Sequence, residues 1–228
     1  MENIIITGAN RGIGFEMAKR FLNEGKHVFA TYRDAKQAEE LISFHSHGTL
    51  TALELDVDDP TSIDRFVAAI GDTRIDVLIN NAGILGPENQ SIHKMDREAW
   101  LTTFSVNTIA PFMLTTALLD NLKRSDNPRV VSISSQMGAL SRNSTGSYAY
   151  RSSKAALNKV MQVLAHELES EGIIVCPVHP GWVRTDMGGE LGEISVQESA
   201  TGLVSLITQL SKEHSGRFWT WEGEEHLW

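Results

Sequence analysis

The sequence has few of the features that mark secreted, membrane-embedded or nucleic-acid-binding proteins. It contains a single cysteine, Cys176, so no disulfide can form within the chain, and this favours a reducing cytoplasm. The apolar neighbours of this cysteine at 173–175 predict a buried, structural thiol. No uninterrupted run of about 18 apolar residues occurs, which excludes an ordinary membrane-spanning helix. Residues 1–4 lack the basic start and long apolar stretch of a secretory signal.

Positive charge is scarce as well. The chain carries 20 lysines and arginines against 29 aspartates and glutamates, a formal net charge of −9 at pH 7. That balance argues against a nucleic-acid-binding surface. Linkers, charge runs and repeats are also absent, and 41% hydrophobic with 21% charged residues is typical of a globular chain. We therefore expect one continuous domain over residues 1–228.

Short Val/Ile-rich runs alternate with segments of helical period. Strands are predicted at 4–7, 27–32, 50–55, 75–80, 129–134, 173–179 and, as a short last strand, 217–220. Helices are predicted at 13–24, 35–45, 61–70, 97–123, 148–171 and 196–210. This alternation predicts a Rossmann-like, doubly wound parallel sheet of about seven strands with helices on both faces. Ligands of such sheets bind at the carboxyl ends of the strands, where the winding reverses.

A glycine-rich turn, "TGANRGIG", follows the first predicted strand and opens the first predicted helix. Gly8, Gly12 and Gly14 allow a tight turn and close approach of the backbone to a pyrophosphate, which the free N–H groups of the helix start would bind. The gap between the first two glycines is wider than in GxGxxG, and an ordinary loop is the alternative interpretation. No P-loop lysine is present, which argues against hydrolysis of a nucleoside triphosphate.

The end of the second predicted strand bears on the choice of dinucleotide. An NAD-selective site places an acid there, but this chain has Tyr32 followed by Arg33. Arg33 and Arg11 supply guanidinium groups for a 2′-phosphate, which favours NADP(H) over NAD(H). Two solvated arginines are the alternative, and Asp34 is placed to pair with Arg33.

Asp56 follows the third predicted strand, in "ELDVDDP". Its carboxylate can accept a hydrogen bond from an adenine amino group. A loop or helix-capping acid is an equally good interpretation, since Asp58, Asp59 and Pro60 follow.

The segment "YAYRSSKAAL" at 148–157 holds two tyrosines ahead of a lysine. Tyr150 and Lys154 are four residues apart and share one face of a helix, whereas Tyr148 lies well round from Lys154. An ammonium near a phenol favours the phenolate and lowers the phenol pKa, so that Tyr150 can exchange a proton near neutral pH. Taken alone, such a pair is usually an ordinary surface contact.

Six motifs change this assessment. They are "TGANRGIG" at 7–14, "NNAG" at 80–83, "SVNTIAPF" at 105–112, "SISSQMG" at 132–138, "YRSSK" at 150–154 and "PGWVRTDM" at 180–187. In this order and spacing they resemble the short-chain dehydrogenase/reductase family over essentially the whole chain, and within it the C-factor and sniffer-type carbonyl reductases. The resemblance implies an NADP(H)-dependent oxidoreductase that moves a hydride between nicotinamide and a ketone or aldehyde, or the corresponding alcohol.

The resemblance also implies roles for four catalytic residues. Tyr150 would be the general acid in reduction and the base in oxidation, and Lys154 would bind the nicotinamide ribose and lower the pKa of Tyr150. Ser135 would hold the substrate oxygen, with its neighbour Ser134 as the less favoured choice. Asn107 would hold a water molecule that links Lys154 to solvent as a proton relay, and the alternative is a polar residue that satisfies an irregularity of the helix.

Further residues are implied to bind the cofactor. Besides the glycines, Arg33, Asp56, Tyr150 and Lys154, these are Asn10, Arg11, Ile13, Val57, Asn81, Ala82, Gly83, Pro180, Gly181, Val183 and Thr185. Asn80 is expected to tether neighbouring strands instead. The segment at 187–196 carries Gly188, Gly189 and Gly192, which suggests an open, adaptable loop over the substrate.

Three further expectations complete the interpretation. No metal site is predicted, because the histidines, including His45 and His47, lack a companion cluster of ligands. The helices that begin at 97 and 148 pair between subunits in the family, which implies a homodimer or homotetramer. An NADP(H)-binding signalling or regulatory protein with little turnover is the alternative function, while nucleotide-sugar epimerases or dehydratases need a substrate domain for which this chain has no room.

Overall fold

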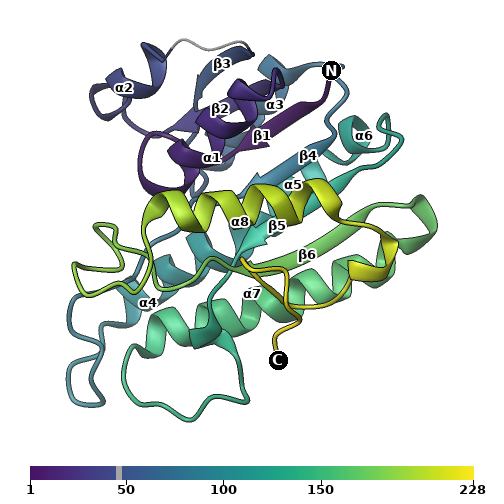
Figure 1. The fold of residues 1–228 in the computed structure, drawn as a ribbon. Coiled ribbons are helices and arrows are strands. Elements are labelled where there is room, and N and C mark those ends of the chain that lie inside the picture. The colour runs from purple at the N-terminus through teal and green to yellow at the C-terminus, as the bar shows by residue number, and fades with distance from the viewer. Residues whose placement is uncertain (45–47) are drawn as a thin grey trace.

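The computed structural model of the protein describes residues 1–44 and 48–228. Its centre is a parallel sheet of seven strands in the order β3-β2-β1-β4-β5-β6-β7 (Figure 1). The strands are β1 Asn3–Ile6, β2 His27–Tyr32, β3 Thr49–Glu54, β4 Val77–Asn80, β5 Arg129–Ile133, β6 Ile174–His179 and β7 Trp219–Thr220. The predicted fold class is therefore confirmed.

Helices cover both faces of this sheet. They are α1 Gly12–Asn23, α2 Glu39–Ile42, α3 Pro60–Ile70, α4 Arg97–Phe104, α5 Ala110–Ala117, α6 Leu119–Leu122, α7 Tyr148–Glu167 and α8 Val196–Gln209. Figure 1 shows α8 crossing in front of the sheet. Ile4 and Ile6 of β1 pack on the α1 and α8 side, whereas Ile5 between them packs on the side of α3, α5 and α7. Alternate residues of one strand thus enter two cores, as a sheet covered on both faces requires.

Two predicted helices have a different form. The segment predicted at 35–45 is a 3-10 turn, Ala35–Gln37, followed by the single turn of α2. Asp34 causes the turn, because its carboxylate accepts a hydrogen bond from the backbone N–H of Lys36 at 2.9 Å. The end of that prediction, at residue 45, lies outside the described residues.

The helix predicted at 97–123 is divided. A π-helical turn at Ser105–Ile109 separates α4 from α5, and α6 follows after Leu118. The π turn carries Asn107 at its centre, and the buried side chain of Asn107 bonds to other parts of the chain. Contacts of Asn107 with distant parts of the chain therefore accompany the loss of regular α-helical hydrogen bonding at this turn. The helix predicted at 148–171 ends at Glu167, and a 3-10 turn at Glu169–Glu171 completes the segment.

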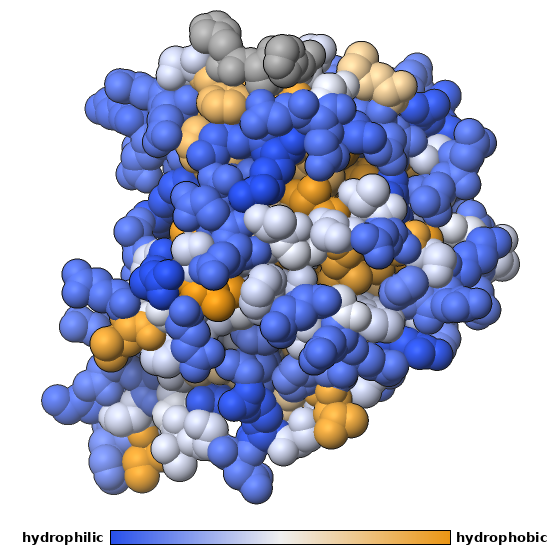
Figure 2. Space-filling model, viewed as in Figure 1, coloured by the Kyte–Doolittle hydropathy of each residue, from blue (hydrophilic) through white to orange (hydrophobic). Residues whose placement is uncertain are grey.

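The winding of the sheet reverses between β1 and β4, which lie side by side although β2 and β3 separate them in sequence. Figure 1 shows the loops that follow β4, β5 and β6 at the same end of the molecule. Figure 2 shows that the face in this view is mainly hydrophilic, with small groups of hydrophobic residues between polar ones. A crevice for a ligand is expected at the reversal.

Two smaller predictions also have outcomes. Cys176 is buried in β6, and its thiol donates a hydrogen bond to the carbonyl of His214. Burial raises the pKa of this thiol to about 12. The prediction of a buried, structural thiol is therefore confirmed. In the described part of the chain, no helix has the length and apolar character needed to cross a membrane.

Candidate active site

A cleft of about 520 Å³ opens at the carboxyl ends of the strands. Predicted residues that line it are Gly8, Asn10, Arg11, Gly12, Ile13, Gly14, Arg33, Asp56, Val57, Asn81, Ala82, Gly83, Tyr150, Lys154, Pro180 and Thr185. The segments that follow β1, β2, β3, β4 and β6 therefore meet the helix α7 at one cleft.

The glycine turn fits closely against the loop after β4. A Cβ atom on Gly14 would lie 2.5 Å from Nδ2 of Asn81 and 2.6 Å from the carbonyl oxygen of Gly8, so no side chain fits there. Gly8 has φ +62°, and a Cβ atom there would lie 3.1 Å from Cα of Ala82. The turn therefore needs glycine at position 14 for space, and at position 8 for both space and backbone conformation.

Asn81 holds this arrangement together. Its Nδ2 donates hydrogen bonds to the carbonyls of Thr7 at 2.8 Å and Gly8 at 3.1 Å. The neighbouring Asn80 donates to the hydroxyls of Thr115 and Ser132, so it ties strands and helix together as predicted. Arg11, which precedes α1, provides no side-chain cap, so no capping side chain covers the helix start that faces the cleft.

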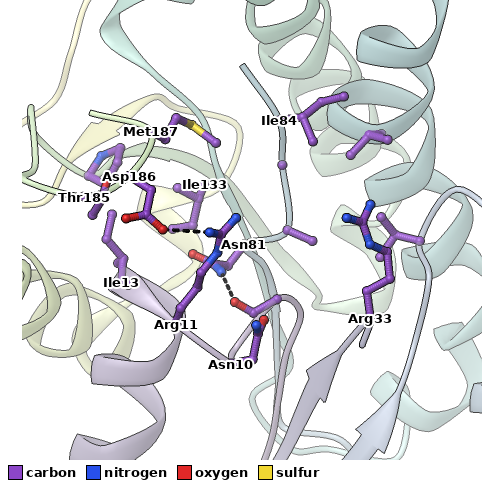
Figure 3. A pocket seen from close by; sticks show the side chains of 18 of the residues that line it. Asn10, Arg11, Ile13, Arg33, Asn81, Ile84, Ile133, Thr185, Asp186 and Met187 are labelled. Atoms are coloured by element: carbon purple, nitrogen blue, oxygen red, sulfur yellow. Dashed lines mark hydrogen bonds and ion pairs between the residues drawn. The ribbon is translucent and has the colours of Figure 1, made fainter. Parts of the chain in front are cut away.

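The two arginines predicted to act together lie apart. Figure 3 shows Arg11 directed at Asp186, whose carboxylate lies 2.7 Å from the Arg11 guanidinium, and Arg33 on the other side of the cleft. Within the described residues Arg33 has no hydrogen bond or ion pair. Asp34 does not take that place, because its carboxylate caps the following 3-10 turn.

Asp56 is half-buried in the wall of the cleft. One of its carboxylate oxygens accepts a hydrogen bond from the backbone N–H of Asp58 at 3.0 Å. The acid that caps α3 is Asp59, whose carboxylate accepts from the N–H of Thr61 at 2.9 Å. Asp56 is thus a loop acid at the cleft and does not cap the helix.

Tyr150 and Lys154 lie on one face of α7, with the Lys154 ammonium 5.8 Å from the centre of the Tyr150 ring. The Lys154 side chain is buried and donates a hydrogen bond of 2.8 Å to the carbonyl of Ile133, the last residue of β5. Burial lowers the pKa of Lys154 from 10.5 to about 8, because the ammonium loses its hydration.

The pKa of Tyr150 differs from the expectation. Burial raises this pKa, and a hydrogen bond with Ser135 only partly opposes the shift. Lys154 contributes no lowering of this pKa, and its ammonium donates a hydrogen bond to the carbonyl of Ile133. Helical spacing brought the ammonium over the Tyr150 ring, while its hydrogen bond goes to the carbonyl of Ile133.

Ser134 and Ser135 have separate surroundings. The hydroxyl of Ser134 donates a 2.5 Å hydrogen bond to Oδ1 of Asn158 on α7, within the core. The hydroxyl of Ser135 accepts from the N–H of Met137 at 3.1 Å and forms the hydrogen bond that lowers the Tyr150 pKa. Ser135 is therefore the serine beside Tyr150, although it is not among the residues that line the cleft.

Asn107 is fully buried behind the cleft. Its Oδ1 accepts from the N–H of Ile84 at 2.9 Å, and its Nδ2 donates to the carbonyl of Ile84 and to the hydroxyl of Ser153. A Cβ atom on Gly83 would lie 3.2 Å from Oδ1 of Asn107 and 3.5 Å from Nζ of Lys154. The two side chains therefore approach each other across the backbone of Gly83.

The segment after β6 is held more firmly than its glycines suggested. Trp182 donates from its ring nitrogen to the carbonyl of Gly188, and Arg184 donates to the carbonyl of Gly192. Val183, which is buried, pairs with Ile194. Gly181, at φ +89°, packs against Ile194 and Trp221, so Gly181 and Val183 support the cleft without lining it.

Several lining residues were not predicted. They are Asp34, Gln37, Leu55, Asp58, Ile84, Thr102, Val106, Ile133, Ser134, Asp186, Met187 and Val196. Asp34, Asp58, Ile84 and Asp186 stand next to predicted residues at strand ends, and that position was a usable signal. Thr102 comes from α4, where no motif marked it, and Val106 lies in the motif at 105–112, of which only Asn107 was assigned a role.

Metal ligation has no candidate in the part of the chain that the structure describes, where no three His, Cys, Asp or Glu side chains gather. His45 and His47, which the sequence analysis weighed, lie outside the described residues.

Together the sheet reversal and the glycine turn define a dinucleotide-binding α/β protein with a tyrosine, lysine and serine at the cleft. A family model described as short chain dehydrogenase matches residues 2–195, so the chain belongs to this family of oxidoreductases.

Known proteins resemble the chain closely. The C-signal protein of Myxococcus xanthus is 40% identical over 155 residues, which cover 68% of this chain and 93% of that protein. The structure of an NADPH-bound carbonyl reductase from chicken fatty liver is 35% identical with a TM-score of 0.94, and 100% of this chain and 99% of that one are covered. The carbonyl reductase Sniffer of D. melanogaster is 34% identical, with a TM-score of 0.92 and full coverage of both chains.

The buried Lys154 makes stability depend on pH. Between about pH 8 and 10.5 the unfolded chain retains a proton on this lysine that the folded protein has released, so the folded protein gains stability as the pH rises. The unfolding free energy of the wild type should rise relative to that of Lys154→Met by roughly 2–3 kcal/mol across this window. Urea unfolding of both proteins at several pH values measures the difference, and a difference that stays constant contradicts the buried ammonium.

The close fit at Gly14 predicts a local clash. Gly14→Ala should displace the Asn81 amide from the carbonyl of Gly8 and lower the unfolding free energy by about 1–3 kcal/mol. NMR signals of the Asn81 side-chain amide should shift in this variant. Gly25→Ala is the control, since that glycine has φ +75° but nothing within 4 Å, and it should leave the Asn81 signals in place.

Proposed function

We propose that the protein is an NADP(H)-dependent oxidoreductase that transfers a hydride between the nicotinamide and a carbonyl or alcohol substrate. The observation that carries this proposal is that Tyr150 and Lys154 line the same cleft as the glycine turn, with Ser135 hydrogen-bonded to Tyr150. The NADPH-bound carbonyl reductase of 35% identity supports it. The substrate would be a small ketone or aldehyde.

The chain's own residues would perform the proton chemistry. Bound NADPH would supply the hydride. The phenol of Tyr150 would donate its proton to the carbonyl oxygen, which the hydroxyl of Ser135 would hold in place. Because burial keeps the pKa of Tyr150 high, the phenol carries its proton at neutral pH, as a general acid for reduction must.

Lys154 would provide positive charge beside Tyr150. With a pKa of about 8 it is mostly an ammonium at pH 7, and one of its protons is committed to the carbonyl of Ile133. The remaining donors would bind the nicotinamide ribose. The side-chain amide of Asn107 is engaged with Ile84 and Ser153, and we propose that it contributes to a proton relay through its place beside Lys154.

The residues of the cleft fit a dinucleotide. The start of α1 carries no side-chain cap, and the glycines leave its backbone accessible to a pyrophosphate. Arg33 stands alone on the side of the cleft where a 2′-phosphate would lie, and Asp56 offers a carboxylate for adenine. Pro180 and Thr185 would border the nicotinamide, with Gly181 and Val183 behind them.

An NADP(H)-binding signalling protein with little turnover is the second candidate, favoured by the 40% identity to C-signal. Purified protein that binds NADPH but oxidises none of it with any member of a broad carbonyl panel would support this candidate.

Assembly and compartment are further proposals. Leu101 and Ile109 on the α4 side, and Val163 on α7, leave about half of their surface exposed, which suits pairing of subunits as a homodimer or homotetramer. A buried single thiol is compatible with the cytoplasm.

Tyr150→Phe tests the proposed chemistry. Loss of the transferable proton should lower kcat for NADPH-dependent carbonyl reduction by about 100-fold or more, with NADPH binding retained. Tyr148→Phe, which changes the exposed tyrosine at the start of the same helix, is the matched control and should keep wild-type kcat. A fully active Tyr150→Phe protein would rule out this mechanism.

Arg33→Asp tests the cofactor preference. An acid at this position would repel a 2′-phosphate and could bind a ribose hydroxyl, so the NADPH to NADH ratio of kcat/KM should fall by at least about tenfold. Arg124→Asp makes the same charge change at an exposed arginine paired with Asp72. An unchanged ratio in Arg33→Asp, or an equal fall in both variants, contradicts the role of Arg33.

A further inference from the structure

The helix that carries Tyr150 begins without a normal cap. Ser147, the residue before α7, has the left-handed conformation φ 51°, ψ 42°, and its side chain caps nothing. Normal N-cap residues are extended and accept hydrogen bonds from the second or third helical N–H group. In α7 those groups belong to Ala149 and to Tyr150 itself.

Gln90 takes the place of the missing cap from a distant part of the chain. Its Oε1 accepts hydrogen bonds from the N–H groups of Ala149 at 2.9 Å and Tyr150 at 3.2 Å. Gln90 belongs to the long loop between β4 and α4, some 60 residues away in sequence. One side chain therefore serves both groups that a local cap would serve.

The other end of the same carboxamide is also engaged. Its Nε2 donates to the carbonyls of Leu85 at 2.8 Å and Pro87 at 3.1 Å, within its own loop. Gly86 lies between them at φ +89°, where a Cβ atom would be 2.7 Å from Oγ1 of Thr103 and 3.4 Å from Cβ of Ala149. The loop is thus packed against α4 and α7, and this holds Gln90 in place.

The backbone of Ala149 is shielded from solvent at this helix start. Ala149 has no exposed surface, so its N–H group would be left without a partner if the Gln90 oxygen were removed. An unpaired buried N–H group is costly, and the first turn of α7 would open to reach another acceptor. Tyr150 lies in that first turn, so its phenol would move with it.

We propose that Gln90 is a positioning residue for Tyr150, which it holds at the substrate by capping the first turn of α7. The inference rests on the proposed function, since it concerns the placement of the proposed general acid. Gln90 is not among the residues that line the cleft and acts through the backbone of residues 149 and 150. Its loss should therefore lower kcat more than it weakens the binding of NADPH, which depends on the glycine turn and Arg33.

Two substitutions separate the functions of the carboxamide. Gln90→Leu has a similar size and removes both the acceptor and the donor. Gln90→Glu keeps an acceptor for the two N–H groups, where the positive end of the helix dipole favours a carboxylate, but loses the donor to the loop. Gln209→Leu, at an exposed glutamine at the end of α8, is the control and should match the wild type.

Each protein is measured by steady-state NADPH oxidation with one carbonyl substrate, by NADPH titration and by hydrogen exchange at the amides of Ala149 and Tyr150. Gln90→Leu should lose protection at both amides and lose about 10- to 100-fold in kcat, with the Kd of NADPH within about threefold of wild type. Gln90→Glu should retain protection and most of kcat. The retained NADPH affinity shows that each variant is folded.

The inference requires kcat and amide protection to fall together. Full kcat in Gln90→Leu would overturn it. So would a Gln90→Glu protein that keeps both amides protected but loses as much kcat as Gln90→Leu. A wild-type protein that reduces no carbonyl would instead contradict the proposed function, while unchanged exchange in Gln90→Leu would contradict the cap by itself.

Discussion

The burial of the Lys154 amino group is the constraint on which the site depends. An ammonium in the interior must keep a hydrogen-bonding partner, and the partner here is the carbonyl of Ile133 at the end of β5. That bond ties α7 to the end of β5. Gly83 lies beside both side chains, since a Cβ atom there would crowd Oδ1 of Asn107 at 3.2 Å and contact Nζ of Lys154 at 3.5 Å.

The loop after β4 brings the separate parts of the site together. Asn81 ties its start to the glycine turn, Asn107 ties Ile84 to the π turn, and Gln90 ties its later part to the start of α7. Each tie is a side-chain amide, a group that can donate and accept hydrogen bonds at once, and Gln90 uses both to join its own loop to α7. The cofactor end and the catalytic end of the cleft are therefore held by one chain segment with three amide contacts.

Much of this arrangement could be predicted from the sequence. The strands were found because buried parallel strands are short apolar runs, and the motifs placed Gly8, Asn81 and Tyr150 at one edge of the sheet. An irregular helix at Asn107 was only the alternative to a water-binding role, and its π form could not be predicted, since it depends on contacts with Ile84 and Ser153 that are remote in sequence. The role of Gln90 could not be predicted either, because it caps a helix 60 residues away. Nor could the acceptor of Lys154, because helical spacing identifies a shared face but does not identify the carbonyl that an ammonium binds.

The two arginines show how geometry refines an interpretation based on residue type. The sequence offered Arg11 and Arg33 as equivalent partners of a phosphate, but Arg11 is paired with Asp186 and Arg33 has no partner within the described residues. Both members of the Arg11–Asp186 pair are largely exposed, and such pairs contribute only about 0–1 kcal/mol, so Arg11 could still be drawn to an anion. Arg33 can bind a phosphate without first breaking an ion pair within the described residues. A preference for a 2′-phosphate should therefore depend on Arg33 first, with Arg11 adding only what remains after its separation from Asp186.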